Sequence, residues 1–483
     1  MVNTGKGQQQ QAARLAAATG ALLLGAALRL VALARPVTLH PDEALFSTFA
    51  RAAAVNGDWL LPGPLDKPPL ALYANALAQV FAGEGALAAR LPGALAGIVL
   101  IAAVYALARR LYGGAGVPLL AALLAALSPL AISYSASAFT DALMLPLAAL
   151  ALAAGAGGRW LACGLLLGLA LASKHQAIYY LPLCLALGWT AGRLNRRGLL
   201  RCGGGAGLAL AALLLWDAAR GGTGTFALAA ANNDPARLVR AVEITPRLAA
   251  WFDHGAQLFG PAGAALLPLG LAAVMARVVV QPRRRAALAD VLLLAFTLAY
   301  LLLHWLVAFN TYERYLLLLI APLCLLAARG LAWSADVLRL PDRIRLALTG
   351  ALALALLPAA LGAAAGRSPL DAERARYDGI EALAAHLNSK PVATVIYDRW
   401  LGWELGYYLG QWSDKRRVYY PTPEMLAAGA LALREQGTRY FPVPASQPVT
   451  LWLDALREAG FTVEVDLRLP NFVVYALRPP PGL

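Results

Sequence analysis

The sequence predicts a polytopic α-helical membrane protein that ends in a small α/β domain. Of its 483 residues, 60% are hydrophobic and only 14% are charged, and the mean hydropathy is +0.60. This balance is far from that of soluble proteins. From about residue 368 the apolar runs shorten and alternate between helical and strand periods, which is typical of a layered α/β domain. The predicted parts are a disordered cytoplasmic tail at 1–14, a transmembrane domain at 15–366 and an extracytoplasmic domain at 367–483.

Eleven apolar segments are predicted to span the membrane, with the N-terminus inside and the C-terminus outside. They are 15–34, 90–109, 117–134, 141–157, 160–173, 177–192, 199–216, 257–280, 287–308, 315–332 and 346–365. The loops assigned to the inside are rich in arginine and those assigned to the outside are richer in acids, as the positive-inside rule requires. Two of the segments, 141–157 and 160–173, are short and closely joined, so a count that differs by two stays open.

Charge and cysteine content exclude two other classes of protein. The net charge is +14, but the basic residues are scattered among apolar runs, which gives little support for nucleic-acid binding. The four cysteines lie within or at the ends of apolar segments and form no C-x-x-C pair. Neither a disulfide framework nor a structural zinc site is indicated. The residue usage is typical of a GC-rich bacterial genome.

The stretch HPDEALFSTFARAAAVNGDW, residues 40–59, is the candidate for the chemistry. It places the adjacent carboxylates Asp42 and Glu43 just outside the end of the first span, where water can hold a charge that lipid cannot. Between Pro41 and Asn56 the pattern predicts a short amphipathic helix that lies along the membrane surface. A second interfacial helix is predicted at 69–83. The alternative is a solvated loop whose acid pair is favoured by a helix dipole.

Two later regions outside the spans also have a predicted structure. The outer loop at 217–256 is long enough to be functional or partly ordered. In the C-terminal domain, helices are predicted at 379–387, 422–433 and 448–460, and strands at 391–398, 416–420, 438–444, 461–469 and 471–477. The domain contains no G-x-G-x-x-G turn or P-loop, so it gives no nucleotide-binding signal.

The order of motifs in the first half resembles the GT-C superfamily of membrane glycosyltransferases. An apolar anchor is followed by H-P-D-E, a surface helix that ends in N-G-D-W, then D-K-P-P-L, A-A-R-L-P-G-A-L-A-G and A-R-R-L-Y-G. Within that superfamily, the sequence is most similar to the branch of protein O-mannosyltransferases and lipid A aminoarabinose transferases. The similarity is strong over residues 38–185 and weaker through the later spans.

The resemblance implies that a sugar is transferred on the outer face of the membrane from a polyprenyl-phosphate donor, such as undecaprenyl phosphate, to a protein, lipid or glycan acceptor. A single displacement needs a base for the acceptor hydroxyl. Asp42 matches the first acidic residue of the family and is expected to be that base, with Glu43 as its helper. Lys67 matches the lysine of the K-P-P motif and is expected to bind the donor phosphate, while Asp66 stands where some relatives place a metal ligand. A tight turn with a local ion pair is the other interpretation of D-K-P-P.

Asp141 matches the second acidic position, as a metal ligand or a contact to the donor sugar, although it also suits a helix N-terminus. Lys174 matches a lysine expected at the phosphate or sugar, and the alternative is a lysine that extends its ammonium to the membrane surface. His175 departs from the commoner glycine of the family. Arg314 and Tyr315 match an R-Y pair that binds phosphate, or else anchor the chain at the interface.

The long outer loop supplies two further candidates. Arg247 and His254 fall where relatives place an arginine and a histidine near the donor phosphate, although a lone histidine is usually not a ligand. A divalent ion (Mg, Mn, Ca or Zn) held by Asp42, Asp141, Asp66 and His254 is possible, but no fixed spacing demands one.

The expected location is the bacterial plasma membrane. Two rival classes of function remain. A transporter or lipid flippase should have broken helices in matching halves and ionisable groups near the midplane. A sensor or scaffold would work through its C-terminal domain. The sequence identifies neither the sugar nor the acceptor.

Overall fold

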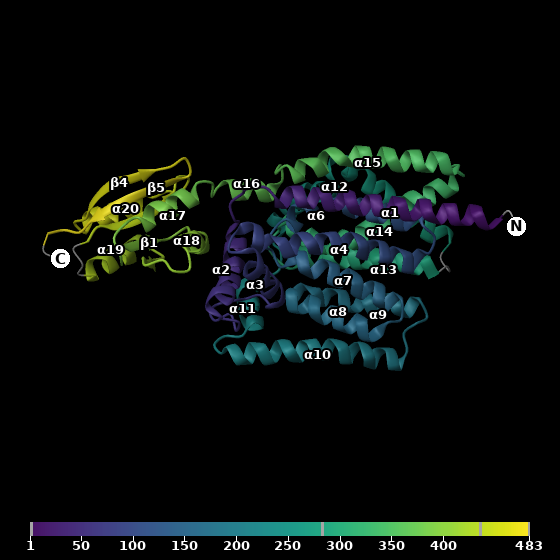
Figure 1. Ribbon diagram of the computed structural model, residues 1–483, viewed down its shortest axis with the longest axis horizontal. Coiled ribbons are helices and arrows are strands. Elements are labelled where there is room, and N and C mark those ends of the chain that lie inside the picture. Colours follow the sequence, from purple (N-terminus) through teal and green to yellow (C-terminus); the bar gives the residue numbers. More distant parts are fainter. Residues whose placement is uncertain (1–2, 282–284, 434–436, 482–483) are drawn as a thin grey trace. The chain divides into compact units, whose positions relative to one another are not determined.

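The computed structural model describes residues 3–281, 285–433 and 437–481 and divides the chain into two compact units (Figure 1). The first unit comprises residues 1–35 and 53–368, and the second comprises residues 36–52 and 369–483. The second unit therefore takes in a short early stretch that the sequence analysis assigns to the membrane part. The boundary between the units falls inside α2 (Pro41–Asn56).

The first unit is built from helices. Its elements are α1 (Asn3–Leu33), α3 (Leu70–Ala82), α4 (Ala86–Tyr112), α5 (Gly116–Leu127), α6 (Pro129–Ser135), α7 (Asp141–Ala156), α8 (Trp160–Ser173), η1 (His175–Tyr179), α9 (Tyr180–Thr190), α10 (Arg196–Arg220), α11 (Thr225–Asn233), α12 (Ala241–Val280), α13 (Arg285–Leu306), η2 (Glu313–Leu319), α14 (Ile320–Val337) and α15 (Asp342–Ala364). Helix α1 begins at Asn3, so it takes in polar residues that were expected to be disordered. Glutamine is a good helix former, which accounts for this difference.

Among the described residues, six helices are long and apolar enough to cross a membrane, or up to eight if each of two bent pairs is one span. The predicted count of eleven is therefore not confirmed, although every predicted segment overlaps helical structure. Three of the predicted spans fall in short helices, because α7 has 16 residues, α8 has 14 and α9 has 11. Helices of that length fall below the roughly 20 residues that a span needs.

Breaks in two helices follow from proline and glycine. Helices α5 and α6 meet at 58° where Pro129 begins the second helix and the Ser128 hydroxyl caps it. Within α12, Gly260 has a φ of 71°, which is left-handed, and Pro261 follows it. Proline lacks the N–H that an unbroken helix requires, so the chain bends there.

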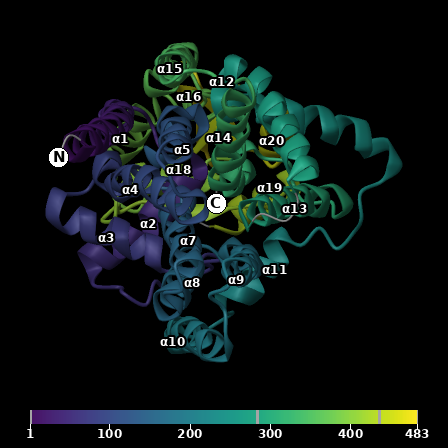
Figure 2. The same ribbon diagram turned by 90° about the vertical axis from the view of Figure 1, so that its right-hand side faces the viewer.

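Small residues bring α8 and α10 into close contact. A Cβ placed on Gly164 would lie 2.0 Å from the carbonyl oxygen of Cys202, and one on Gly168 would lie 2.4 Å from the Cβ of Ala209. Figure 2 looks along these helices and shows α7, α8 and α10 as neighbouring layers. Glycine at helix contacts lets backbones approach closely, as is common inside membranes.

The second unit has a five-stranded sheet covered by helices on both faces. Its strands are β1 (Val395–Asp398), β2 (Arg416–Tyr419), β3 (Arg439–Pro444), β4 (Thr462–Arg468) and β5 (Phe472–Arg478), and its helices besides α2 are α16 (Pro369–Ala375), α17 (Ile380–Asn388), α18 (Gly402–Leu409), α19 (Pro423–Ala432) and α20 (Thr450–Glu458). The strand order is β2-β1-β3-β5-β4, in which β1 pairs in parallel with β2 and β3. Strands β3, β5 and β4 are antiparallel neighbours.

Alternating side chains divide this sheet between two cores. Ile396 packs with α17 and α18 on one face, whereas Val395 and Tyr397 pack with α19 and α20 on the other. This follows from the two-residue period of a strand. The predicted small α/β domain is confirmed, including its last two strands as an antiparallel pair.

Candidate functional site

The first unit buries an ion pair between Lys174 and Asp141. Lys174 follows the end of α8 and Asp141 begins α7, and the lysine Nζ lies 2.6 Å from the aspartate Oδ1. Their exposed fractions are 7% and 2%. Burial lowers the pKa of Lys174, the charge of Asp141 opposes this, and the charges of Arg314 and Lys67 lower it further. Charges from two distant parts of the chain therefore act on Lys174.

Lys67 lies in the loop between α2 and α3 and pairs with its neighbour Asp66 at 2.6 Å. Both side chains are largely buried, with exposed fractions of 20% and 13%. The Asn233 side chain at the end of α11 donates a hydrogen bond to the same oxygen of Asp66 at 3.4 Å. The local ion pair of the alternative interpretation is thus present, and a helix from the long outer loop contacts it.

His175 joins this cluster, although the sequence marked it only as a departure from the family. Its ring centroid lies 4.5 Å from that of Phe226 in α11, and its Nε2 atom is buried without a hydrogen-bond partner. Burial lowers the pKa of His175 to about 4, and the charge of Lys67 also contributes to lowering it. The imidazole is therefore neutral near pH 7, and Nε2 is available to a ligand.

Arg314 and Tyr315 come from η2, which precedes α14. The Arg314 guanidinium lies 5.0 Å from the ring centroid of Tyr312 and 5.2 Å from that of Phe139. Lys174 in turn lies 5.9 Å from the ring centroid of Tyr315. Cations over aromatic faces are attracted by the ring quadrupole. The structure therefore brings the predicted R-Y pair to the predicted lysine.

Arg247 and His254 on α12 instead face the backbone that leads into η2. The Arg247 Nη2 atom donates to the carbonyls of His304 at 2.8 Å and Phe309 at 2.5 Å. The Nε2 atom of His254 lies 3.3 Å from the carbonyl oxygen of Thr311. These contacts hold the segment before Arg314 in place, which is a structural role beside the predicted binding of phosphate.

The two predicted catalytic carboxylates belong to the second unit. The backbone N–H of Asp42 donates to the Nδ1 atom of His40 at 3.1 Å, and its side chain is partly exposed. Glu43 is fully buried, and Arg374 donates to both of its carboxylate oxygens at 2.9 Å. No motif indicates this partner, because Arg374 is 331 positions away.

The described residues contain no group of three or more His, Cys, Asp or Glu side chains that could hold a metal ion. Asp66 and Asp141 are each paired with a lysine, and His254 faces a backbone carbonyl. This donor set does not fit a metal site as it stands, so metal binding stays a prediction and enters no step below.

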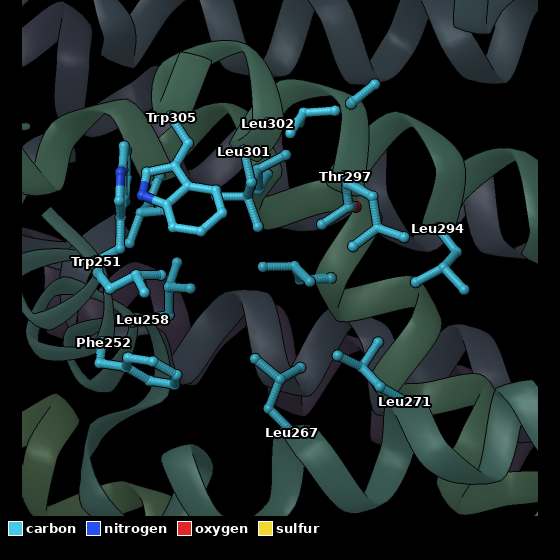
Figure 3. A pocket seen from close by; sticks show the side chains of 17 residues that line it. Trp251, Phe252, Leu258, Leu267, Leu271, Leu294, Thr297, Leu301, Leu302 and Trp305 are labelled. Atoms are coloured by element: carbon cyan, nitrogen blue, oxygen red, sulfur yellow. The ribbon is translucent and has the colours of Figure 1, made fainter. Parts of the chain in front are cut away.

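An apolar cavity of about 760 Å³ lies between α12, α13 and the η2–α14 segment (Figure 3). Trp251 and Trp305 lie at one end and Leu271 and Leu294 at the other. The Trp251 ring contacts that of His304 at 5.8 Å, and the His304 ring lies 5.5 Å from that of Tyr315. Aromatic contacts therefore connect the wall of the cavity to the R-Y pair.

The sequence matches known proteins over its first half. Residues 66–216 match the family described as dolichyl-phosphate-mannose-protein mannosyltransferase. The undecaprenyl phosphate-alpha-4-amino-4-deoxy-L-arabinose arabinosyl transferase of Pseudomonas aeruginosa strain UCBPP-PA14 is 32% identical over 191 residues, which are 36% of this chain and 34% of that protein. The same transferase from Pseudomonas paraeruginosa strain DSM 24068 gives the same identity and coverage. The matched region thus spans about a third of the length of these relatives.

The fold matches over nearly the whole chain. The crystal structure of ArnT from Cupriavidus metallidurans in the apo state is similar over 95% of this chain and 98% of that chain, with a TM-score of 0.63 and 17% identity. The structure of the same protein bound to undecaprenyl phosphate gives a TM-score of 0.62 at 16% identity, over 98% of each chain. These structural matches establish a shared fold.

Proposed function

We propose that this chain transfers a sugar, as GT-C glycosyltransferases of the ArnT and protein mannosyltransferase type do. The family match over residues 66–216, the arabinosyl transferase relatives and the shared fold support this proposal. The donor is a sugar linked to undecaprenyl phosphate or a related polyprenyl phosphate, and the acceptor is a protein, lipid or glycan of the cell envelope. The arabinosyl transferase activity of the relatives and the undecaprenyl phosphate bound to ArnT support this donor class.

The observation that carries the proposal is that Lys174 and Arg314 both lie 5.9 Å from the ring centroid of Tyr315, with the charges of Arg314 and Lys67 both acting on Lys174. The three cations come from the loop before α3, the end of α8 and the start of η2. Lysine and arginine are the side chains that pair with phosphate oxygens. A phosphodiester at this place would share the lysines with Asp66 and Asp141 and would relieve the repulsion among the three cations.

The apolar cavity supports a lipid-borne donor. Its lining is almost wholly hydrocarbon and aromatic, from Trp251 and Trp305 to Leu294. An isoprenoid chain would bury its apolar surface there, while its phosphate end reaches the R-Y pair along the contacts of His304.

In the transfer itself, the acceptor oxygen attacks the anomeric carbon of the sugar as the bond from that carbon to the phosphate oxygen breaks. Polyprenyl phosphate leaves with the bonding electron pair, and Lys67, Lys174 and Arg314 stabilise its new charge. Asp42 accepts the proton of the attacking hydroxyl as general base. The distribution of arginine among the loops supports a site on the outer face, with the N-terminus in the cytoplasm and the last domain outside.

A transporter or flippase is the alternative that the sequence left open. The charged groups of the cluster lie at helix ends, such as the start of α7 and the end of α8, instead of in the middle of long helices. This placement supports a transferase that acts at the membrane surface over a transporter that carries a substrate across the membrane.

The test is transfer of radiolabelled sugar from an undecaprenyl-phosphate donor to cell-envelope material by the purified protein and its Asp42→Asn variant. Loss of transfer by a folded Asp42→Asn protein is expected. Glu84→Gln, which changes an exposed acid in the loop before α4, is the matched control and should keep full activity. Unchanged transfer by Asp42→Asn would reject the proposed base.

A further inference from the structure

Glu43 and Arg374 form a buried, two-pronged ion pair in the second unit. Arg374 donates from Nε and Nη2 to the two carboxylate oxygens, each at 2.9 Å. One of these oxygens also accepts the backbone N–H of His40 at 3.0 Å. The exposed fractions are 0% for Glu43 and 3% for Arg374. Both oxygens are thus engaged, which suits an anchor and not a second catalytic acid.

A second contact from α16 reaches His40, two residues before Asp42. The Nδ1 atom of His40 accepts the backbone N–H of Asp42 at 3.1 Å, so in the neutral ring Nε2 carries the proton. That Nε2 lies 3.0 Å from a carboxylate oxygen of Glu373. Glu373 therefore fixes the orientation of the ring that holds the Asp42 backbone.

The segment of residues 40–43 is also held by contacts that precede and follow it in the chain. Before it, the Thr38 hydroxyl donates to the Arg374 carbonyl at 3.0 Å, and the Leu39 N–H donates to the Tyr408 hydroxyl at 2.9 Å. After it, Arg51 donates to the carbonyl of Tyr407 at 2.8 Å and lies over its ring at 4.4 Å. Residues of the C-terminal domain make every one of these contacts.

We propose that Arg374 is a positioning residue for the transfer reaction, acting with Glu373 through Glu43 and His40 to hold Asp42. The C-terminal domain then positions the catalytic base Asp42, and it does so by binding Glu43 through Arg374. This inference rests on the proposed role of Asp42. A displaced base loses rate, since a shift of about 1 Å can cost about a hundredfold.

The experiment compares kcat and KM for the undecaprenyl-phosphate sugar in the full-length protein and its variants. Arg374→Gln should lower kcat about hundredfold, while KM for the donor stays near the wild-type value because the donor's cations lie elsewhere in the chain. Arg376→Gln, an exposed arginine two residues on, is the matched control and should behave as wild type. An unchanged kcat in Arg374→Gln, with Asp42→Asn inactive, would overturn the positioning role and leave the proposed function intact.

Two more variants guard against loss of folding, which thermal unfolding in detergent would detect. Arg374→Lys keeps the charge but loses the two-pronged geometry; a folded protein with a lowered kcat supports the proposal, and one with full kcat overturns it. Glu43→Gln keeps an oxygen that can accept the His40 N–H but loses the charge that pairs with Arg374, so a folded protein with a lowered kcat is expected. Full kcat in a folded Glu43→Gln protein would show that the anchor role is wrong. Transfer by Asp42→Asn would instead contradict the proposed function.

Discussion

Lys174 donates to Asp141 across 2.6 Å, from the end of α8 to the start of the preceding helix α7. Each side chain is the nearest opposite charge of the other, and both are shielded from water. Removing one partner of such a buried pair leaves a charge without compensation, at a cost of about 3–5 kcal/mol.

Lys174→Met should therefore destabilise the protein by about that amount and raise KM for the donor, because one phosphate ligand is lost. Thermal unfolding in detergent and donor titration would measure the two effects. The double variant Lys174→Met with Asp141→Asn is the control. It should recover most of the stability but not the affinity, and recovery of both would remove Lys174 from the donor site.

His175 offers its Nε2 atom to a ligand in a neutral ring. If that atom bonds the donor, His175→Phe should raise KM for the donor about tenfold, the equivalent of about 1.4 kcal/mol. His175→Gln keeps a polar end, so its KM for the donor should stay within about threefold of the wild-type value. A KM near the wild-type value for His175→Phe, together with a raised KM for His175→Gln, would show instead that the contact of the ring with Phe226 matters and that Nε2 does not.

Gly164 tests the contact between α8 and α10. An alanine there would place its Cβ 2.0 Å from a backbone oxygen that cannot move aside, so Gly164→Ala should cost about 1–3 kcal/mol. Gly203→Ala on α10, whose Cβ would meet nothing within 4 Å, should be neutral or stabilise by up to about 1 kcal/mol. Unfolding of both variants in the same detergent is the measurement, and similar stabilities would contradict the close approach.

Glu404 on α18 makes the second unit sensitive to pH. Burial raises the pKa of Glu404 from 4.5 to about 7, against the hydrogen bond of Tyr377. Between pH 4.5 and 7 the folded state binds more protons than the unfolded state, so stability falls as pH rises through that window. The free energy of unfolding falls by up to about 3 kcal/mol, and this loss is complete above pH 7.

Glu404→Gln should remove this dependence and make the protein more stable than wild type at pH 8. Thermal unfolding of full-length protein at pH 5 and pH 8 would check both statements. A pH dependence that persists in the variant would assign the effect to another group.

Periodicity predicted most of the fold. In the C-terminal domain the predicted helices and strands appear within a few residues of their expected bounds, because its short elements have clear alternation and turn residues between them. The sequence did not indicate α18, whose residues GWELGYYL contain two glycines. Span counting was less successful. The sequence marks the segments that become α7 and α8 as short, but hydropathy alone does not decide whether such short helices are to be counted as spans.

The local motifs predicted the cation cluster but not its partners. Asp66 with Lys67 is a neighbouring pair that the sequence displays directly. The contact of Lys174 with Asp141 depends on how α7 and α8 pack, and that of Glu43 with Arg374 joins residues 331 positions apart. Only the folded chain reveals such pairs, because no spacing rule links them.

The second unit is assembled from two pieces of chain that are separated by the whole membrane part. During translation, residues 36–52 leave the ribosome long before residues 369–483 exist, so the nascent chain holds Glu43 and its neighbours without their final contacts. The buried pair of Glu43 and Arg374 can therefore form only after the second piece has been synthesised. A product truncated after the membrane helices would keep those helices but would lack Arg374, so Glu43 would have a carboxylate without its ion-pair partner.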